Sequence, residues 1–382
     1  MLQILGRGIL EDNIFTISFS DLEDPRITGR TAHSLIEIIG LAICSVICGA
    51  DTWTEIELFC KLKIDWFKKF FQLKNGIPSH DTFGRVFSLI NADEFRKCFN
   101  LWISSVNKII QDEIIAIDGK TLRRSFDKVN GKSAIHMVSA WASNAGMVLG
   151  QIKVDDKSNE ITAIPKLLDL LVTKNCIVTI DAMGCQKNIA AKIIEKKSDY
   201  VLALKGNQGN LHNDIKLFFD DCLNRNFKDI SNSYYETFDK DHGRIEKRKY
   251  WITKEINWIN DKNEWKGLKS IGIGISEVEE KGLKRTETRY FITSLDENAE
   301  KFGDAVRKHW KIETSLHWVL DIAFREDENR VRTDFAPENF AVIRHLALDI
   351  IKQDKSKGSI RCKRLKAGWD NNFLENLLFK KF

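Results

Sequence analysis

The chain has 382 residues, of which 43% are hydrophobic and 30% are charged, and its formal net charge is +5. This composition excludes a disordered chain and a collagen-like fibre, and the length predicts two or three compact units. The eight cysteines form no C-x-x-C pair, which excludes a zinc knuckle and a secreted disulfide framework and indicates thiols in a reducing compartment.

The first 110 residues have the periodicity of helices, and we expect them to form an all-helical N-terminal domain. Ser79 is placed to cap a helix that begins at His80. A DNA-binding module fits this pattern, and so does a helical scaffold. Apolar and aromatic side chains recur at helical spacing in residues 35–48, 53–62, 66–71 and 95–106.

No membrane segment is expected. The longest apolar run covers residues 38–50, which is shorter than the roughly 20 residues that a membrane span needs. The first residues also lack the basic and apolar regions of a signal peptide. We therefore expect a soluble, cytoplasmic protein.

Short apolar strands alternate with helices in the next segment, residues 111–209. Their order is strand, strand, strand, helix, strand, helix, strand, which is the core order of the ribonuclease H fold. In that fold the first and fourth strands are neighbours, so Asp118 and Asp181, which follow them, are expected side by side. The predicted strands are 113–117, 134–143, 147–154, 176–180 and 200–204, and the predicted helices are 161–172 and 186–196.

The remaining residues divide into two parts. Residues 210–293 are expected to be a β-rich insertion, because strands are predicted there after a helix at 211–223. Residues 294–382 are expected to contain a core helix over 298–324 and a basic tail, since 352–366 has seven basic residues and one acid. The strands predicted in the insertion are 246–254, 269–278 and 288–294.

The two strand-end acids suggest a chemistry. Carboxylates of Asp118 and Asp181 would converge on a hard cation, Mg²⁺ or Mn²⁺ rather than zinc. Glu313 is expected to be a third acid, on the late helix. It belongs to a series spaced by four residues that would share one helical face turned toward a polar cleft: His309, Glu313, His317 and Asp321. Two ions about 4 Å apart in such a site would clamp both oxygens of a phosphodiester displacement.

Several motifs of the sequence resemble those of a known family. The chain is similar to the DDE transposases of bacterial insertion sequences, in the group that includes the H-repeat-associated proteins, over residues 24–378. The resemblance implies a ribonuclease H-like core interrupted by a β-rich insertion, DNA transposition, and a place at the bacterial nucleoid. It rests on the strings GIPSHDTFGRVF (76–87), IAIDGKTLRRS (115–125), IDAMGCQ (180–186), ALKGNQ (203–208), HGRIEKR (242–248) and RKHWKIETSLHWVLDIAFREDENRVR (307–332).

Carried over by motif, the resemblance implies that Asp118, Asp181 and Glu313 are the catalytic acids and hold two Mg²⁺ ions, for which Mn²⁺ would substitute. Glu326 and Asp327 are rivals for the third acid. The wider superfamily places Tyr, Arg and Lys around its last Glu as Y-x2-R-x3-E-x6-K. This chain departs from that pattern, because the corresponding positions are Val306, His309 and Leu320.

DNA is the expected partner, as the terminal inverted repeats of the protein's own element and as target DNA, bound by a homodimer in the synaptic complex. Two alternatives stay open: a nuclease of the same fold without strand transfer, and an inactive remnant that only binds DNA. Cys185, Trp141, Trp310 and Trp318 are expected to pack in the core. The residues expected to contact DNA are Lys120, Arg123, Arg124, Lys205, Arg244, Arg307, His309 and His317.

Overall fold

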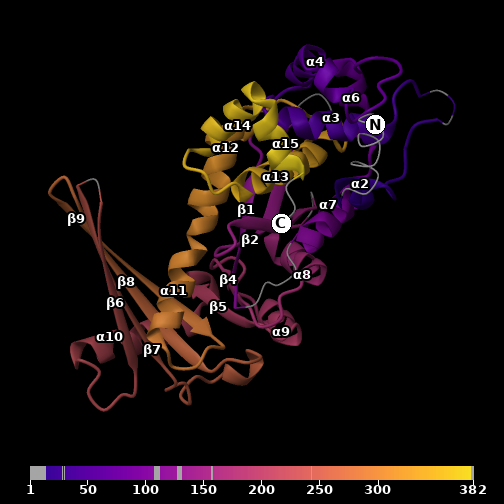
Figure 1. Cartoon of the computed structure of the whole chain (residues 1–382). Coiled ribbons are helices and arrows are strands. Elements are labelled where there is room, and N and C mark those ends of the chain that lie inside the picture. Colours follow the sequence, from indigo (N-terminus) through magenta and orange to yellow (C-terminus); the bar gives the residue numbers. More distant parts are fainter. Residues whose placement is uncertain are drawn as a thin grey trace.

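The computed structural model describes residues 14–27, 29, 31–106, 112–126, 131–155, 158–241 and 243–379. The predicted domain boundary at 110–111 lies outside these residues. Three parts follow one another in space: a body of helices from both ends of the chain, a central sheet flanked by helices, and an arm of long strands (Figure 1). The molecule is therefore a mixed α/β protein with one large sheet.

The N-terminal part is helical, as predicted. Ser79 caps α6, with its hydroxyl accepting the N–H of Thr82 at 3.3 Å, so the predicted start at His80 is confirmed. Thr52 and Glu55 form a capping box at the start of α4. The helices are α2 (Ile14–Phe19), α3 (Leu35–Ile47), α4 (Trp53–Leu62), α5 (Ile64–Phe67), α6 (His80–Leu89) and α7 (Ala92–Val106).

The central sheet has nine strands in the order β3-β2-β1-β4-β5-β9-β8-β7-β6. Strand β1 runs parallel to β4, and β4 runs parallel to β5, while the other neighbouring pairs are antiparallel. The expected neighbourhood of the first and fourth strands is thus confirmed. The first five strands are β1 (Ile114–Thr121), β2 (His136–Ala142), β3 (Met147–Lys153), β4 (Ile177–Ile180) and β5 (Asp199–Leu204).

Helices cover both faces of this part of the sheet. Helices α8 (Glu160–Leu170) and α9 (Lys187–Glu195) contact β2, β3 and β5, and α11 (Ala299–His309) contacts β1, β4 and β5. Side chains alternate between the faces of a strand. Gly119 of β1 faces Glu160 of α8, so its neighbour Asp118 faces the side on which α11 lies. Polar groups near Asp118 and polar groups near Gly119 therefore lie on opposite faces of the sheet.

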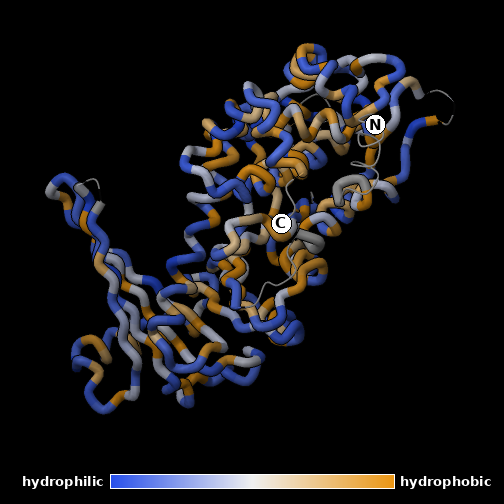
Figure 2. The backbone as a smooth tube through the Cα atoms, viewed as in Figure 1, coloured by the Kyte–Doolittle hydropathy of each residue, from blue (hydrophilic) through white to orange (hydrophobic). Residues whose placement is uncertain are grey.

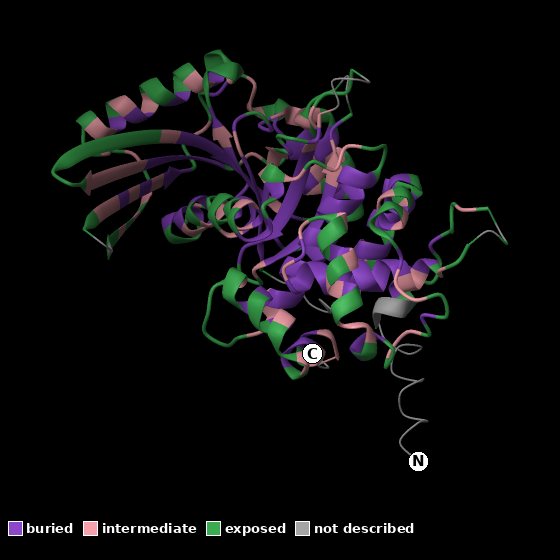
Figure 3. Ribbon diagram, turned by 90° about the horizontal axis from the view of Figure 1, so that it is seen from above, coloured by how far each residue is buried: buried purple, intermediate pink, exposed green. Residues whose placement is uncertain are grey.

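The predicted β-rich segment extends the same sheet as a projecting arm. Its strands are buried where they join the core and exposed toward their outer ends (Figure 3), where the hairpin ends are mostly hydrophilic (Figure 2). Strand β6 is not among the predicted strands. The elements are α10 (Asn210–Asn224), β6 (Ser233–Asp241), β7 (Arg244–Thr253), β8 (Ser270–Glu280) and β9 (Leu283–Thr293).

The C-terminal residues return to the helical body. Helix α13 is buried along most of its length and packs against α3, α6 and α7. The predicted basic tail is wrong in part, because Arg364 is buried and donates to the carbonyls of Val46 and Ala50 and to the carboxylate of Asp51. The helices are α12 (Trp318–Phe324), α13 (Ala336–Gln353), α14 (Ile360–Trp369) and α15 (Asn371–Phe379). Within the described parts of the chain, no helix has the length and apolar character needed to cross a membrane.

Candidate active site

Two acids meet at one edge of the sheet. Ile117 of β1 pairs with Ile180 of β4 in parallel register, so Asp118 and Asp181 occupy equivalent positions on adjacent strands. Strand β1 does not end at Asp118, as the sequence had suggested. It continues to Thr121, because its pairing with β2 persists beyond the end of β4. The backbone of Asp118 is therefore paired with β2 but not with β4, and its side chain lines a cavity together with His309 of α11.

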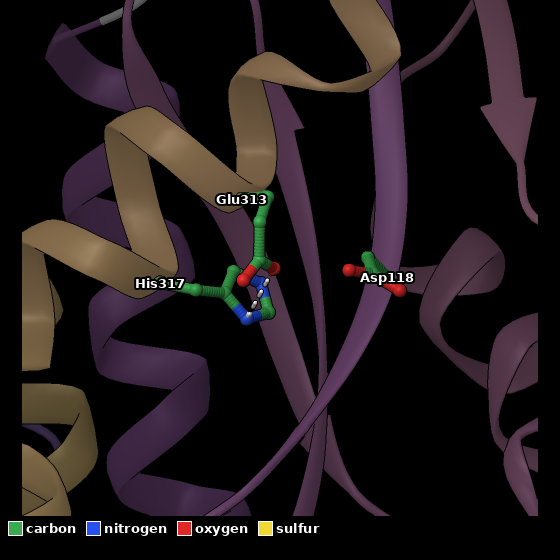
Figure 4. Close-up of side chains that lie close together, drawn as sticks. All are labelled: Asp118, Glu313 and His317. Atoms are coloured by element: carbon green, nitrogen blue, oxygen red, sulfur yellow. Dashed lines mark ion pairs between the residues drawn. The ribbon is translucent and has the colours of Figure 1, made fainter. Parts of the chain in front are cut away.

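The third acid comes from a break in the late helix. Helix α11 ends at His309, and a single π-helical turn, Glu313–His317, precedes α12. From this turn Glu313 and His317 project toward Asp118 (Figure 4). Each of the three offers one ligand atom, and these atoms lie within 4.8 Å of one another. The helical spacing of the sequence did not predict the π turn, a feature that often marks functional sites in helices.

Asp118, Asp181 and Glu313 line one cavity of about 160 Å³. Asp181 lies outside the close group, and its Oδ1 accepts the N–H groups of Met183 at 3.0 Å and Gly184 at 3.3 Å. This loop fixes the direction of the Asp181 carboxylate. The cavity thus offers oxygen donors from two strands and a helix, which is a suitable set for a hard divalent ion.

The charge of this cavity is unbalanced. Burial, together with the negative charges of Asp181, Glu160 and Glu313, raises the pKa of Asp118 to about 7, although the Gly119 N–H opposes the rise. Lys205 lines the cavity but is exposed. A cation bound among the carboxylates would remove this repulsion, so the donor set fits a divalent metal.

The two histidines of the site are neutral near pH 7. Burial lowers the pKa of His309 to about 4, and its Nδ1 lies 3.1 Å from the hydroxyl of Thr179 on β4. Burial, followed by the charge of Lys120, also lowers the pKa of His317 to about 4. Neither ring therefore supplies positive charge to a phosphate, and the DNA contacts of His309 and His317 stay a prediction for neutral rings. All four residues of the series spaced by four face β1 or β4, as expected for one helical face: His309, Glu313, His317 and Asp321.

Lys120 belongs to a second group of charges on the same face of β1. It pairs with Asp321 of α12, with Glu326 at 2.9 Å and, more distantly, with Asp327. Glu326 is buried, and although burial opposes it, the charges of Lys120 and Arg344 hold its pKa below the ordinary value. Lys120 is therefore committed to the protein's own carboxylates and does not present a free charge to DNA. Glu326 is not among the residues that line the acid cavity, so the geometry favours Glu313 as the third acid.

The other predicted DNA contacts lie at the surface. Arg123 and Arg124 are exposed beside β1, and Arg123 pairs with Asp327 at 3.1 Å. Arg244 and Arg307 line a trough of about 780 Å³ between α11 and strands β7, β8 and β9 of the arm. This trough joins the acid cavity, because both are lined by Arg289, Phe291, Val306 and Trp310.

Several residues near the site escaped the sequence analysis. Arg289 stacks on Trp310 with 4.0 Å between its guanidinium carbon and the ring centroid. Trp310 and Trp318 are 47% and 59% exposed, so their expected place in the core is wrong, whereas Trp141 and Cys185 are buried as expected. No local pattern identifies Arg289, because its position depends on the pairing of β9 with β5 and β8.

A polar pair lies behind the site on the opposite face of the sheet. His136 Nε2 is 2.6 Å from Glu160 Oε1, and its Nδ1 is 2.9 Å from the hydroxyl of Thr121. A side chain at Gly119 would collide with both His136 and Glu160. Glycine at this position therefore lets Glu160 approach β1 and add its charge to the environment of Asp118.

Comparisons with known proteins agree on a family. A family model described as "Transposase DDE domain" matches residues 110–350, and one described as "DDE_Tnp_1-associated" matches residues 16–103. The "Putative transposase YncI" of one Escherichia coli strain is 44% identical over 364 residues, covering 94% of this chain and 93% of that protein. The "H repeat-associated putative transposase YhhI" of another strain is 41% identical over 368 residues, covering 94% and 96%.

One solved structure was also similar. A cryo-EM structure of a piggyBac transposase synaptic complex with hairpin DNA aligns with 98% of this chain and 80% of that chain, with a TM-score of 0.42 and 10% identity. A likeness at this level does not assign a fold.

Proposed function

This chain belongs to the DDE transposase family, and from that premise we propose that it is a DNA transposase that cuts DNA at the ends of an insertion sequence and joins the freed 3′ ends to target DNA. The observation that supports this most is that Asp118, Asp181 and Glu313, from separate parts of the chain, line one cavity. We further propose that the order β3-β2-β1-β4-β5 is a ribonuclease H-like core, with residues 210–293 as its insertion.

We propose that Asp118, Asp181 and Glu313 hold two Mg²⁺ ions, with Mn²⁺ as a substitute. All three supply carboxylate oxygens, and burial together with the charges of Asp181, Glu160 and Glu313 raises the pKa of Asp118, an effect that a bound cation would offset. When bound, the ions would acidify a water or a 3′-hydroxyl and offset charge on the phosphodiester. The Met183 and Gly184 N–H groups orient the Asp181 carboxylate before any ion arrives.

The path of the DNA is proposed from the continuity of the cavity and the trough. The trough is lined by six basic residues, which suit a phosphate backbone. Lys205, at the cavity, would contact a phosphate beside the cut. The basic residues of the trough are Arg244, Arg248, Lys281, Arg285, Arg289 and Arg307. Helices of residues 1–110, with exposed Arg85 on α6, would bind the terminal inverted repeat, and a homodimer would bring two ends together.

Cleavage of a plasmid that carries the flanking ends of the element tests the proposal. Wild type and Asp181→Asn would be incubated in Mg²⁺ and in Mn²⁺, and the 3′ termini would be mapped. We expect metal-dependent cuts at the element boundary from the wild type. We expect the variant to cut at least 1000-fold more slowly, which corresponds to about 4 kcal/mol of activation free energy.

The products separate the alternatives. Cuts at the boundary without joined target DNA would favour a nuclease of the same fold. A folded wild-type protein that binds the ends but never cuts them, in either metal, would contradict the catalytic proposal and favour an inactive DNA-binding protein.

A further inference from the structure

A small polar cavity adjoins the buried ring of His317. Its volume is about 10 Å³, and Lys120, Ser139 and Leu316 are among its lining residues. Four more lining side chains are at most 4% exposed, and each has a polar atom without a hydrogen-bond partner in the protein. These atoms are Nε2 and Oε1 of Gln151, Nε2 of His317, Oε1 of Glu326 and Nδ1 of His345.

Buried polar atoms in native proteins nearly always have a partner, and a cavity that holds one water needs a volume of about 10–15 Å³ and two to four polar neighbours. This cavity meets both conditions. One water molecule there would accept from the N–H of His317 Nε2 and donate to the Oε1 atoms of Glu326 or Gln151. That arrangement leaves the lone pair of His317 on Nδ1.

The Nδ1 atom of His317 faces the carboxylate of Glu313. It lies 4.0 Å from Glu313 Oε2, which is too far for a hydrogen bond. Ligand atoms of Asp118, Glu313 and His317 all lie within 4.8 Å of one another. Two ligands of one ion with bonds of about 2.1 Å lie up to about 4.2 Å apart, so small side-chain movements would close the group around a cation.

We propose that His317 is a ligand, through Nδ1, of the divalent ion held by Asp118 and Glu313, and that one water in the cavity of Gln151, Glu326 and His345 holds its Nε2–H. This inference rests on the proposed metal-dependent function and adds a nitrogen ligand to an otherwise all-oxygen site. Metal-bound histidines ordinarily donate their second N–H to such a partner, which fixes the tautomer and the ring orientation.

The nitrogen ligand has a consequence for metal choice. Mg²⁺ prefers oxygen ligands, whereas imidazole favours transition metals. We expect the wild-type protein to bind Mn²⁺ more tightly than Mg²⁺, and the substitution His317→Asn to narrow that difference. The amide oxygen of Asn lies close to the place of Nδ1, so this variant exchanges the nitrogen ligand for an oxygen.

Electron paramagnetic resonance of Mn²⁺ bound to the purified full chain tests the proposal directly. Pulsed spectra of the wild type are expected to contain the hyperfine coupling of a coordinated imidazole nitrogen. His317→Asn should lose this coupling and bind Mn²⁺ about tenfold more weakly. The matched control is His309→Gln, which changes the other histidine close to the cavity and should keep the coupling.

A second variant tests the role of the buried cavity without removing the ligand. Gln151→Leu should keep the nitrogen coupling but bind Mn²⁺ about tenfold more weakly, with thermal unfolding as the check that the chain folds. Bound Mn²⁺ that is displaced by Asp118→Ala but lacks nitrogen coupling in the wild type would overturn the proposal and leave the proposed function intact. No Mn²⁺ binding at millimolar concentration would overturn both.

Discussion

Two groups of charge lie on the same face of β1, two residues apart, and they differ in balance. Around Asp118, burial and the nearby carboxylates raise its pKa to about 7, and none of the described basic groups forms an ion pair with it, although Lys205 and Arg289 line the same cavity. Around Lys120, one ammonium group and the guanidinium of Arg344 match the carboxylates of Asp321 and Glu326. The matched group links the sheet to α12 and α13, and its charges offset one another without a bound ion. The unmatched group is incomplete until a cation binds, which is the signature of a site rather than of a structural core.

Breaking the matched group should have the largest effect on stability. Lys120→Met leaves the buried carboxylate of Glu326 with only Arg344 at 3.7 Å, and Asp321 with no described cation. We expect the free energy of unfolding to fall by about 3–5 kcal/mol, because removing one member of a buried ion pair strands the other. Urea unfolding at neutral pH measures it. A loss below about 1 kcal/mol would show that Lys120 is not a structural charge.

Removing a charge from the unmatched group should raise the free energy of unfolding, whereas breaking the matched group should lower it. In metal-free wild type, the folded state keeps a proton on Asp118 up to about pH 7, whereas the unfolded chain releases it near pH 4. The Asp118 contribution to the free energy of unfolding therefore falls as the pH rises between these values. Asp118→Asn lacks this fall, so we expect it to be more stable than wild type by about 2–4 kcal/mol at pH 8.

Urea unfolding in a chelator at pH 5 and pH 8 measures this difference, which should be smaller at pH 5 because only part of the fall between about pH 4 and pH 7 has then occurred. Glu313→Gln is the matched control: its side chain is 61% exposed, so a smaller gain is expected. If the free energies of unfolding of wild type and Asp118→Asn changed equally between pH 5 and pH 8, the folded state would not disfavour the charge on Asp118.

Sequence patterns predicted which acids lie near one another but not which charges are paired within the protein. The adjacency of Asp118 and Asp181 followed from the order of strands, and Glu313 followed from family strings. The partners of Lys120 lie 201 and 206 residues further along the chain, so no local pattern separates a phosphate contact from a buried ion pair. The exposed face of Trp310 and the packing of α13 against the N-terminal helices are likewise set by tertiary contacts.

Arg307 of the trough lies between these extremes, because its charge is paired but exposed. Arg307 is about half exposed and pairs with Asp239 at 3.3 Å. In Arg307→Ala we expect the affinity for a DNA duplex of the element end to fall about three- to tenfold, and the salt dependence to lose about one phosphate contact. Fluorescence anisotropy across a salt series measures both. Arg225→Ala is the control, since Arg225 is also exposed, pairs with Asp221 on α10 and is not among the residues that line the trough.

The smallest effect is expected at the rim of the matched group. Arg123 pairs with Asp327 at 3.1 Å, but its side chain is 78% exposed, in contrast to the 13% of Lys120. Water already solvates an exposed guanidinium, so Arg123→Met should cost only about 0.2–1 kcal/mol. The loss should disappear at about 1 M salt, where screening acts within a few ångströms, whereas the loss in Lys120→Met should persist. Urea unfolding at low and high salt compares the two. Equal salt dependence in both variants would mean that burial does not separate the charges that hold this fold from those at its surface.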